Sequence, residues 1–579
     1  MNNTEIMASY TDWKQAENMP TDLRTELAAM ANDQAAITDA FGTSLSFGTA
    51  GMRGVIGAGT NRMNIFTVRQ ATEGLAQMME TLPAADRDRG VAISFDPRYN
   101  SRLFAHEAAR VLGAHGIKSF VFDDIRPTPE LSFAVRHLHT YAGIMITASH
   151  NPKQYNGYKI YGPDGGQMPP KESDLMTTYV RQVKDLFAIP VAAEPELRKQ
   201  KLLQIIGEDV DVAYLDQIKT VNVNHDLIQT VGKDLKFVYT PLHGTGKIIA
   251  RRALSDAGFQ NYDVVTAQTI ADPEFPTTPF PNPEFAQTFD LAIELGNREN
   301  ADVLIATDPD ADRLGAAVRQ PDGTYQLMTG NQIASVLLDY ILKAKQAAHD
   351  LPADGMVVKS IVSTELATDI AKHYGVTMKN VLTGFKFIAE QIQLAETNHD
   401  HTFLFGFEES FGYLIKPFVR DKDAIQSTML LAEVAAYYKQ QGQTLYDGLQ
   451  GLYKQYGYFE EETISEEFAG LDGQAQMQQL MENFRNHPLT EFNGSQVLAR
   501  EDFLTSEKTT ADGTTTPIDL PQSNVLKYWL ADGTWLAIRP SGTEPKIKFY
   551  VGVKADSQAA ATDRLQSYVA AIHNDLLKQ

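Results

Sequence analysis

Cysteine is absent from this chain of 579 residues. Its absence excludes disulfide bonds, thiolate zinc sites and cysteine nucleophiles, and it fits a reducing compartment. Long apolar runs are also missing, since none approaches the ~18 residues that a membrane helix needs. The chain starts with Met1–Ala8, which has no basic stretch followed by an apolar one, so we expect no signal peptide. A cytoplasmic protein without a membrane segment is therefore predicted.

Positive charge is scarce. Lys and Arg together number 51 against 73 Asp and Glu, which gives a formal net charge of −22. Sequence-independent nucleic-acid binding and attraction to anionic membranes both depend on basic residues, so we expect neither partner. An anionic substrate would have to be held by local basic groups. We therefore expect small-molecule ligands, and a chain that is a monomer or a dimer.

The length indicates several domains. At roughly 150 residues per domain the chain is long enough for about four, and a single hydrophobic core stops growing at roughly 250–300 residues. Hydrophobic residues make up 43% and charged residues 21% of the chain, which is ordinary for folded proteins.

One pattern of strand, polar turn, amphipathic helix, glycine and second strand occurs three times, in residues 91–122, 237–265 and 356–382. Each copy is typical of a parallel βαβ unit, so we expect three similar α/β domains. The glycines stand where the left-handed C′ position of a helix favours this residue: Gly116, Gly258 and Gly375.

The C-terminal part has a different pattern. Two apolar and aromatic strands flank Asp532-Gly533, which is a strong hairpin signal. A third strand (547–551) and an amphipathic helix (557–577) follow, so we expect an α+β domain on an antiparallel sheet. The threonine-rich residues 509–516 are predicted to form a solvated loop.

These patterns predict an N-terminal helical extension and four domains, with boundaries at 1–45, 46–220, 221–335, 336–455 and 456–579. We assign no function to the extension. Four polar loops, one in each predicted domain, follow or join apolar strands. Sites in α/β sheets lie beyond the carboxyl ends of strands, so we expect these loops to share one cleft.

The first loop, Ser149-His150-Asn151-Pro152, ends an apolar strand. A hydroxyl at this place suits a nucleophilic or phosphate-carrying serine, and a turn that merely caps the strand is the alternative. The G-x-S-x-G pattern of Ser-His-Asp hydrolases is absent here. Lys159 follows in Asn156-Gly-Tyr-Lys159. It would suit a general acid or base if burial or neighbouring cations lower its pKa, and is otherwise a surface lysine.

The second loop, Asp308-Pro-Asp-Ala-Asp-Arg313, carries three alternating carboxylates after an apolar strand. Such carboxylates would repel one another unless a hard cation binds them, and few protein ligands suit Mg²⁺ together with a phosphate oxygen. A solvated acidic turn with Arg313 as counter-ion is the alternative. An EF-hand is excluded, because Arg313 and Arg319 stand where that motif needs glycine and glutamate.

The third and fourth loops offer complementary groups. Glu408-Glu409-Ser410 follows an apolar strand and suits sugar hydroxyls, although it also fits the acidic first turn of a helix. Arg539-Pro-Ser-Gly-Thr-Glu-Pro-Lys546 combines a guanidinium, two hydroxyls and a glycine, which together form a nest for a dianion. A basic hairpin tip is the alternative for the fourth loop. A further glycine-rich turn, Phe47–Gly54, contains the cation Arg53 and is non-specific by itself.

In this order, the four loops resemble those of the α-D-phosphohexomutase family. Thr147–Pro152 is similar to its phosphoserine loop, Asp308–Arg313 to its metal loop, Gly406–Ser410 to its sugar-specificity loop and Arg539–Thr543 to its phosphate-binding loop. The resemblance extends from about Phe47 to Lys548, nearly the whole chain. The N-terminal length, Phe47–Gly54 and Thr383-Gly-Phe-Lys386 resemble the longer branch of this family, which includes bacterial phosphoglucomutases.

The resemblance implies three similar α/β domains and a C-terminal domain of the TATA-binding-protein-like kind around a central cleft. It also implies an isomerase that interconverts glucose 1-phosphate and glucose 6-phosphate through a phosphoserine and a glucose 1,6-bisphosphate intermediate. One Mg²⁺ per chain and glucose 1,6-bisphosphate as activator are the cofactors that follow from it.

The site residues follow from the same resemblance. Ser149 would carry the phosphoryl group, with His150, Lys159 and Arg53 as further catalytic residues. The Mg²⁺ ligands would be Ser149, Asp308, Asp310 and Asp312. The substrate-binding residues would be Arg313, Lys386, Glu408, Ser410, Arg539, Ser541, Gly542 and Thr543.

Three positions bear on the sugar. Phe407 stands where many family members have glycine, and Gly412 stands where the phosphomannomutase/phosphoglucomutase branch has histidine; both weigh against mannose specificity. Glu409 matches the glucose-preferring form of the loop. Phosphopentomutase or another phosphosugar mutase remains the main alternative. A metal-dependent sugar phosphatase fits less well, because its Asp-x-Asp-x-Thr/Val pattern would meet Asp312 at the last position. A non-catalytic sugar-phosphate sensor would not require the serine and all three aspartates.

Overall fold

The computed structural model describes residues 2–45, 51–468, 473–541 and 546–577. The chain divides into two compact units. Unit 1 contains the residues up to Ile333 together with Phe385–Thr444, and unit 2 contains Ala334–Gly384 and the residues from Leu445 onward.

Unit 1 begins with helices α1 (Asn3–Gln15), α2 (Thr21–Ala29) and α3 (Gln34–Phe41). Trp13 packs edge-on against Phe41 and Phe66 and is 2% exposed, so the helices bury an aromatic cluster against the following domain. Asn2 and Asp33 cap α1 and α3 with their side chains, as expected for these residue types at a helix start.

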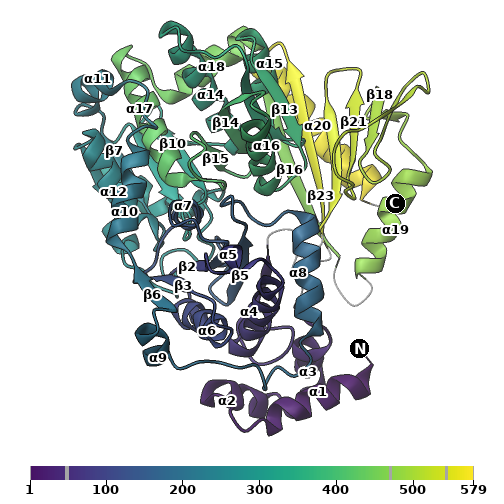
Figure 1. Cartoon of the computed structure of the whole chain (residues 1–579). Coiled ribbons are helices and arrows are strands. Elements are labelled where there is room, and N and C mark those ends of the chain that lie inside the picture. Colours follow the sequence, from purple (N-terminus) through teal and green to yellow (C-terminus); the bar gives the residue numbers. More distant parts are fainter. Residues whose placement is uncertain (1, 46–50, 469–472, 542–545, 578–579) are drawn as a thin grey trace. The chain divides into compact units, whose positions relative to one another are not determined.

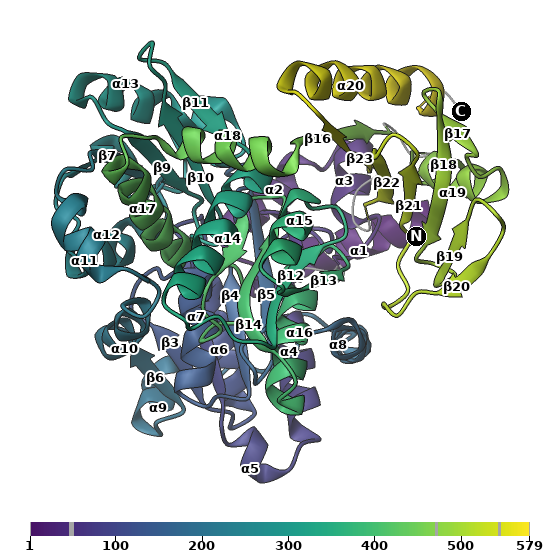
Figure 2. The ribbon, with the colours of Figure 1, turned by 90° about the horizontal axis from the view of Figure 1, so that it is seen from above.

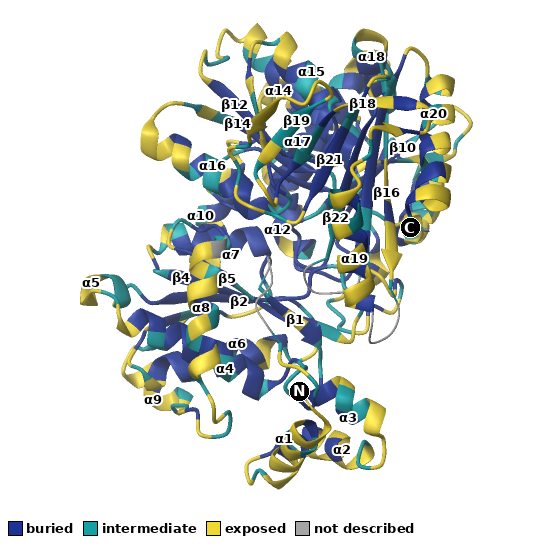
Figure 3. Ribbon diagram, turned by 90° about the vertical axis from the view of Figure 1, so that its right-hand side faces the viewer, coloured by how far each residue is buried: buried dark blue, intermediate teal, exposed yellow. Residues whose placement is uncertain are grey.

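The first sheet of unit 1 has the strand order β1-β5-β4-β2-β3-β6. Helices α4 and α6 cover one face and α7 the other (Figure 1). In Figure 3 its central strands are dark blue, which places the core of this domain around them. The strands are β1 (Met52–Val55), β2 (Val91–Phe95), β3 (Ser119–Phe122), β4 (Ala142–Ile146), β5 (Tyr155–Tyr161) and β6 (Leu203–Ile206). The helices are α4 (Ile65–Glu80), α5 (Ala84–Arg87), α6 (Ser101–Ala114), α7 (Thr128–His137), α8 (Pro170–Gln182), α9 (Glu194–Lys199) and α10 (Glu208–Ile218).

The second sheet of unit 1 has the order β11-β10-β9-β7-β8. Its strands are β7 (Phe237–Thr240), β8 (Tyr262–Val264), β9 (Val303–Thr307), β10 (Leu314–Arg319) and β11 (Tyr325–Met328). Its helical segments are α11 (His225–Leu227), η1 (Ile228–Gly232), α12 (Gly246–Ala257), η2 (Thr266–Gln268), η3 (Ala286–Phe289) and α13 (Asp290–Glu299).

Unit 1 also contains a later part of the chain. The antiparallel strands β14 (Thr402–Glu408) and β15 (Gly412–Leu414) lie between helices α16 (Phe385–Asn398) and α17 (Ala424–Gln440) in sequence. Helix α17 lies beside α12, as Figure 2 shows. Nearly every residue of α17 is buried, including the polar residues Gln426, Ser427 and Thr428 near its start.

Unit 2 contains the third βαβ copy and the C-terminal sheet. Strands β12 (Gly355–Ser360) and β13 (Thr377–Val381) are parallel, with α15 (Leu366–His373) between them. Helix α14 (Gly330–Ala347) crosses the sequence boundary between the units, and α18 (Leu445–Tyr456) leads into the C-terminal part. There the order is β16-β23-β22-β21-β18-β19-β20, and β17 pairs with β18.

The C-terminal strands are β16 (Tyr458–Glu467), β17 (Glu491–Phe492), β18 (Ser495–Asp502), β19 (Glu507–Thr510), β20 (Thr515–Pro517), β21 (Leu526–Leu530), β22 (Trp535–Pro540) and β23 (Lys546–Ala555). The helices are α19 (Gly473–Asn486) and α20 (Gln558–Ala571), the latter continued by η4 (Ile572–Leu576). The pairings between these strands are antiparallel.

The three predicted βαβ units are confirmed. The strand pairs β2/β3, β7/β8 and β12/β13 are all parallel, and the hairpin at Asp532-Gly533 joins β21 to β22. Gly116 and Gly375 have φ of 69° and 71°, in the region that only glycine adopts without strain. The prediction of a solvated loop at 509–516 is wrong, because Thr509 pairs with Thr515 in a short antiparallel hairpin of β19 and β20. Among the described residues, no helix is long and apolar enough to cross a membrane.

Candidate active site

The loop after β4 holds Ser149 in a fixed conformation. Ser149 has φ of 51°, which is unusual for a residue other than glycine, and it is 8% exposed. Its backbone N–H donates to Oγ1 of Thr147 over 2.8 Å. Thr147 in turn donates to Oδ2 of the buried Asp96 over 2.7 Å. This chain of bonds fixes the position from which the serine hydroxyl is presented.

Arg98 binds the backbone carbonyl groups of the same loop. Its guanidinium donates to the carbonyl of Ser149 over 2.6 Å, and to those of Pro152 and Tyr155 over 2.8 and 3.1 Å. Its Nε lies 3.1 Å from Oδ2 of Asp96, and both side chains are fully buried. Sequence reasoning missed this pair, although both residues directly follow β2, at the carboxyl end of a central strand.

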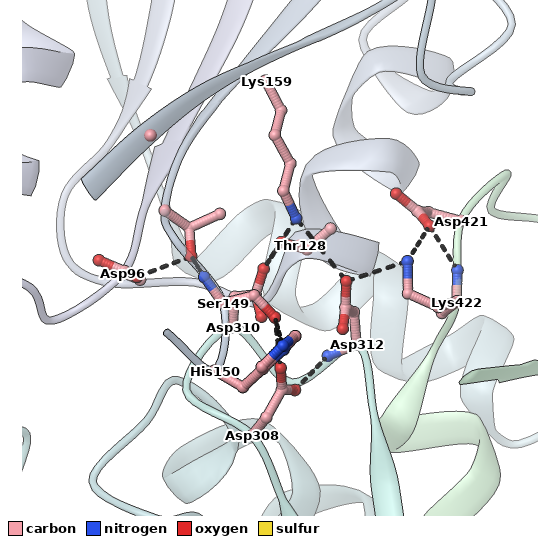
Figure 4. A network of polar contacts seen from close by, with 12 residues as sticks. Asp96, Thr128, Ser149, His150, Lys159, Asp308, Asp310, Asp312, Asp421 and Lys422 are labelled. Carbon is pink, nitrogen blue, oxygen red and sulfur yellow. Dashed lines mark hydrogen bonds and ion pairs between the residues drawn. The ribbon is translucent and has the colours of Figure 1, made fainter. Parts of the chain in front are cut away.

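The Ser149 hydroxyl points at the acidic loop (Figure 4). Its Oγ donates to Oδ2 of Asp308 over 2.6 Å and lies 3.2 Å from Nδ1 of His150. Burial, together with Arg313 and Arg53, holds the pKa of His150 well below its ordinary value. The imidazole beside the hydroxyl is therefore neutral at neutral pH.

The three aspartates lie in the turn between β9 and β10, where Ala311 has φ of 53°. Asp308, Asp310 and Asp312 are buried, and one oxygen from each lies within 4.8 Å of the others. Oδ1 of Asp308 accepts the backbone N–H groups of Asp312 and Arg313 at 3.1 and 3.0 Å. The turn therefore gathers three carboxylates whose mutual repulsion is only partly offset by the chain.

The electrostatics of this turn fit a cation site. Burial and the charges of Asp310 and Asp312 raise the pKa of Asp308 well above its ordinary value. Oδ1 of Asp310 and Oδ1 of Asp312 are buried and have no hydrogen-bond partner among the described residues. Buried carboxylate oxygens need such partners or a metal ion. A hard divalent cation with oxygen ligands would satisfy both atoms and relieve the repulsion.

Asp310 is also held by the first domain. Thr128, the first residue of α7, donates to its Oδ2 over 2.8 Å, and Nζ of Lys159 lies 3.2 Å from the same atom. Burial alone would lower the pKa of Lys159, but Asp310 and Asp312 raise it above the ordinary value. In this arrangement Lys159 is charged and paired with the carboxylates, and its role as a general acid or base stays a prediction.

A further lysine at the aspartate cluster, Lys422, is buried and was not predicted. Nζ of Lys422 lies 3.1 Å from Oδ2 of Asp312 and 3.0 Å from Oδ1 of Asp421 (Figure 4). Oδ2 of Asp421 accepts hydrogen bonds from Tyr161 and Gln167, both at 2.8 Å. The signal in the sequence is the charged run Arg420–Asp423 immediately before the apolar helix α17, since charges are rarely buried unless paired.

The acidic residues after β14 adjoin the aspartate turn. Glu408 is buried at the end of the strand, and Ser410 is half-buried in the turn that follows. Arg313 bridges to Gly412, and the N–H of Leu314 donates to the carbonyl of Phe411 over 3.0 Å. The structure thus joins the second and third predicted loops. Arg313 donates to Oε1 of Glu284 over 2.6 Å, a partner that sequence reasoning missed.

Two further predicted residues belong to unit 1. Nη1 of Arg53 donates to Oδ1 of Asn151 over 3.0 Å, which places this cation beside the Ser149 loop. Lys386 is buried in the first turn of α16, and burial lowers its pKa. Its Nζ lies 5.4 Å from the centre of the Phe387 ring.

The fourth predicted loop lies in unit 2. Arg539 is half-buried near the end of β22, and the N–H of Ser541 donates to the carbonyl of Lys546 over 2.7 Å. Gly542 and Thr543 lie outside the described residues, as do Phe47–Ala50 of the glycine-rich turn.

The structure contains three parallel βαβ units, an antiparallel C-terminal sheet and a serine hydroxyl bound to a buried aspartate cluster. This combination defines the class of protein to which the chain belongs. Residues 44–186, 212–323 and 329–456 match domains I, II and III of phosphoglucomutase/phosphomannomutase, each an alpha/beta/alpha domain, and residues 475–570 match its C-terminal domain. The chain belongs to the phosphoglucomutase/phosphomannomutase family of α-D-phosphohexomutases.

A phosphoglucomutase of Staphylococcus aureus (strain MRSA252) is 42% identical over 521 residues, which cover 89% of this chain and 91% of that protein. Solved structures share the fold at lower identity. A putative phosphomannomutase from Thermus thermophilus has a TM-score of 0.67 and 20% identity, over 93% of this chain and 100% of that one. Parafusin from Paramecium, a phosphoglucomutase in an open form, has a TM-score of 0.68 and 17% identity, over 92% and 95%.

Proposed function

We propose that this chain interconverts glucose 1-phosphate and glucose 6-phosphate, with Ser149 as the residue that carries the transferred phosphoryl group. The observation that carries the proposal is the 2.6 Å hydrogen bond from Ser149 Oγ to Asp308 inside the buried aspartate cluster. The similarity to a phosphoglucomutase of Staphylococcus aureus over most of both chains supports the sugar. Glu409, in the turn after β14, is consistent with glucose.

In this proposal phosphorylated Ser149 transfers its phosphoryl group to a free hydroxyl of the sugar monophosphate. The resulting glucose 1,6-bisphosphate reorients and returns its other phosphoryl group to Ser149 Oγ. In each transfer one P–O bond forms as another breaks, so no phosphate is released. Escaped bisphosphate leaves the enzyme unphosphorylated, and this is why added glucose 1,6-bisphosphate would act as activator.

The chain's own residues position the serine and offset charge. Phosphoserine brings nearly two negative charges. Lys159 and Lys422 both pair with Oδ2 of Asp312, at 3.7 and 3.1 Å, and Arg313 stands at the end of the turn, so fixed cations would lie beside the transferring group. Asp308, Asp310, Asp312 and an oxygen of the modified Ser149 would hold one Mg²⁺, which supplies charge neutralisation for phosphoryl transfer. Such positioning and neutralisation are most of what this chemistry requires.

The sugar and its second phosphate need separate contacts. Glu408 and Ser410 would bind sugar hydroxyls, next to Arg313 on the same side of the aspartate turn. Lys386 would contact substrate from α16. Arg539, Ser541, Gly542 and Thr543 would hold the phosphate that is not reacting. A guanidinium, two hydroxyls and backbone amides can grip a dianion from either end of the sugar, as two successive transfers demand.

The test is a comparison of sugar 1-phosphates. Purified protein with Mg²⁺ and a trace of the matching bisphosphate would receive glucose 1-phosphate, mannose 1-phosphate or ribose 1-phosphate, with product isomers quantified by chromatography. Glucose 1-phosphate should give the highest kcat/KM. A preference for ribose would retain the phosphoserine chemistry and contradict the sugar. Inorganic phosphate without isomer would contradict the mutase and indicate a phosphatase.

A further inference from the structure

The N-terminal extension contributes none of the site residues described above, yet it binds the turn that follows β1, the strand that carries Arg53. We propose that helices α2 and α3 act as a clamp that positions Arg53 for phosphoryl transfer, with Glu26 and Asn61 as positioning residues. This inference rests on the proposed function, and its experiment separates the two.

Arg53 needs external support because of where it lies. It is the second residue of β1, the edge strand of the first sheet among the described strands. β1 pairs with β5 through Arg53 and Gly157, and Nη1 of Arg53 reaches Oδ1 of Asn151, two residues after Ser149. An edge strand is hydrogen-bonded on one side, so its position depends on what holds its ends.

The turn after β1 is hydrogen-bonded directly to the end of this strand. The N–H of Met63 donates to the carbonyl of Val55 over 2.8 Å, and Ile56 and Met63 form a parallel bridge. The N–H of Ile56 donates to the carbonyl of Gln154 over 2.8 Å. Residues 56–63 therefore form a turn that starts directly after Val55, the last residue of β1, and returns to Val55 through the hydrogen bond from Met63.

The extension binds this turn through several hydrogen bonds and an ion pair. Oε2 of Glu26, in α2, accepts the N–H of Ala58 at 2.7 Å. Asn61 donates twice to the end of α3, through its N–H to Ala40 and through Nδ2 to Asp39, both at 2.9 Å. Arg62 also pairs with the carboxylate of Asp39. Hydrogen bonds at residues 58 and 61 and an ion pair at residue 62 thus connect the turn to helices α2 and α3.

The extension packs closely against glycines within residues 54–59. Gly59 has φ of 131°, and an added Cβ there would collide with the carbonyl oxygen of Ala40, so only glycine allows this approach. A Cβ on Gly54, the neighbour of Arg53, would meet the Leu45 side chain at 2.8 Å. Trp13 anchors the helices by packing against Phe66 of α4 and Phe187.

The clamp therefore connects the extension to Arg53 through a short series of contacts. Glu26 binds the turn, the turn binds Val55, and Val55 lies in the same strand as Arg53. Displacement of a positioning group by an ångström lowers turnover by up to ~10²-fold in enzymes. Ground-state binding of the sugar phosphate depends on other residues, so the effect should fall on kcat.

The experiment compares the wild type with the double variant Glu26→Ala/Asn61→Ala in the mutase assay. We expect kcat to fall about 10-fold with little change in KM. Glu26→Gln keeps a carbonyl oxygen for the Ala58 N–H and should retain near wild-type kcat. The matched control is Glu17→Ala, an exposed glutamate of the same extension. In an Arg53→Ala background the double variant should cause no further loss, because its effect is exerted through Arg53.

Hydrogen exchange provides a second measurement that does not depend on activity. Peptides covering residues 52–63 should exchange faster in the double variant, while those from α4 and α6 remain protected. Equal losses of kcat with and without Arg53, or unchanged exchange in β1, would overturn the clamp. A wild type that turns over no sugar phosphate would instead contradict the proposed function, and exchange would still decide whether the clamp exists.

Discussion

The hydroxyl of Ser149 donates a 2.6 Å hydrogen bond to Oδ2 of Asp308, a residue 159 positions later in the chain. The two residues follow β4 and β9, buried strands of two different sheets in unit 1. Each stands in a turn with a left-handed residue, at Ser149 itself and at Ala311. The contact brings the hydroxyl to a group of carboxylates that the chain alone leaves incompletely satisfied.

Ser149→Ala should abolish turnover while the fold is retained. The hydroxyl is the only atom of the residue that reaches Asp308, and its loss removes the phosphoryl acceptor without creating a large cavity. The mutase assay described above measures turnover, and far-UV circular dichroism measures whether the fold is retained. Near-normal activity in this variant would contradict the phosphoserine mechanism.

Mg²⁺ should raise the melting temperature of the wild type by a few degrees at concentrations well above Kd, since a ligand that binds only the folded state stabilises it. The variant Asp310→Asn/Asp312→Asn should lose this response, because it replaces two of the three gathered carboxylates. Differential scanning fluorimetry with and without Mg²⁺ provides the measurement. Asp322→Asn, in an exposed turn, is the control that should respond like the wild type. An equal response in all three proteins would place the metal elsewhere.

Much of this cluster could be predicted from the sequence. Ser149 and Asp308 each follow an uninterrupted apolar strand, which placed both at the carboxyl ends of strands, where sites form. The alternating carboxylates predicted a cation site. The oxygens on Asp310 and Asp312 that lack a hydrogen-bond partner within the described part of the chain agree with it.

The partners from distant segments could not be predicted. Lys422 and Glu284 come from segments whose local pattern is a charged run and a proline-rich loop, and only the tertiary fold brings them to Asp312 and Arg313. The strand β16 was missed for a related reason. Its sequence Glu460-Glu-Glu-Thr-Ile-Ser-Glu-Glu467 is polar because it lies at the edge of its sheet, where few side chains are buried.

Arg98→Met should destabilise the protein by about 3–5 kcal/mol, the usual loss when one partner of a buried ion pair is removed. Asp96 would be left without its cation, and the Ser149 loop would lose carbonyl partners. Urea unfolding gives the free energy. Adding Asp96→Asn to Arg98→Met should recover part of the loss, since it removes the unpaired charge. If Arg98→Met unfolded like the wild type, the role assigned to this pair would be wrong.

Stability should depend on pH through Lys527 in unit 2. Burial lowers the pKa of this lysine to about 8, although Glu365 partly opposes the shift. The unfolded chain, with a lysine pKa of about 10.4, then holds more protons than the folded one between these values. The free energy of unfolding should therefore gain a contribution that rises with pH across this window.

The measurement is urea unfolding at several pH values in the wild type and in Lys527→Met. The difference in stability, wild type minus variant, should increase from pH 8 to pH 10. Nζ of Lys527 lies 4.1 Å and 4.7 Å from the rings of Trp529 and Trp535, so tryptophan fluorescence should change with a midpoint near pH 8. A flat difference and no fluorescence transition would show that Lys527 remains charged.

The most direct test of the central claim is a single transfer of the phosphoryl group. The protein would be incubated with glucose 1,6-bisphosphate, separated from it and analysed by peptide mass spectrometry before and after addition of glucose 1-phosphate. The account predicts one phosphoryl group on the peptide that contains Ser149, and its disappearance as glucose 1,6-bisphosphate forms. A phosphoryl group on another residue, or an unmodified enzyme that still isomerises the sugar phosphate, would contradict it.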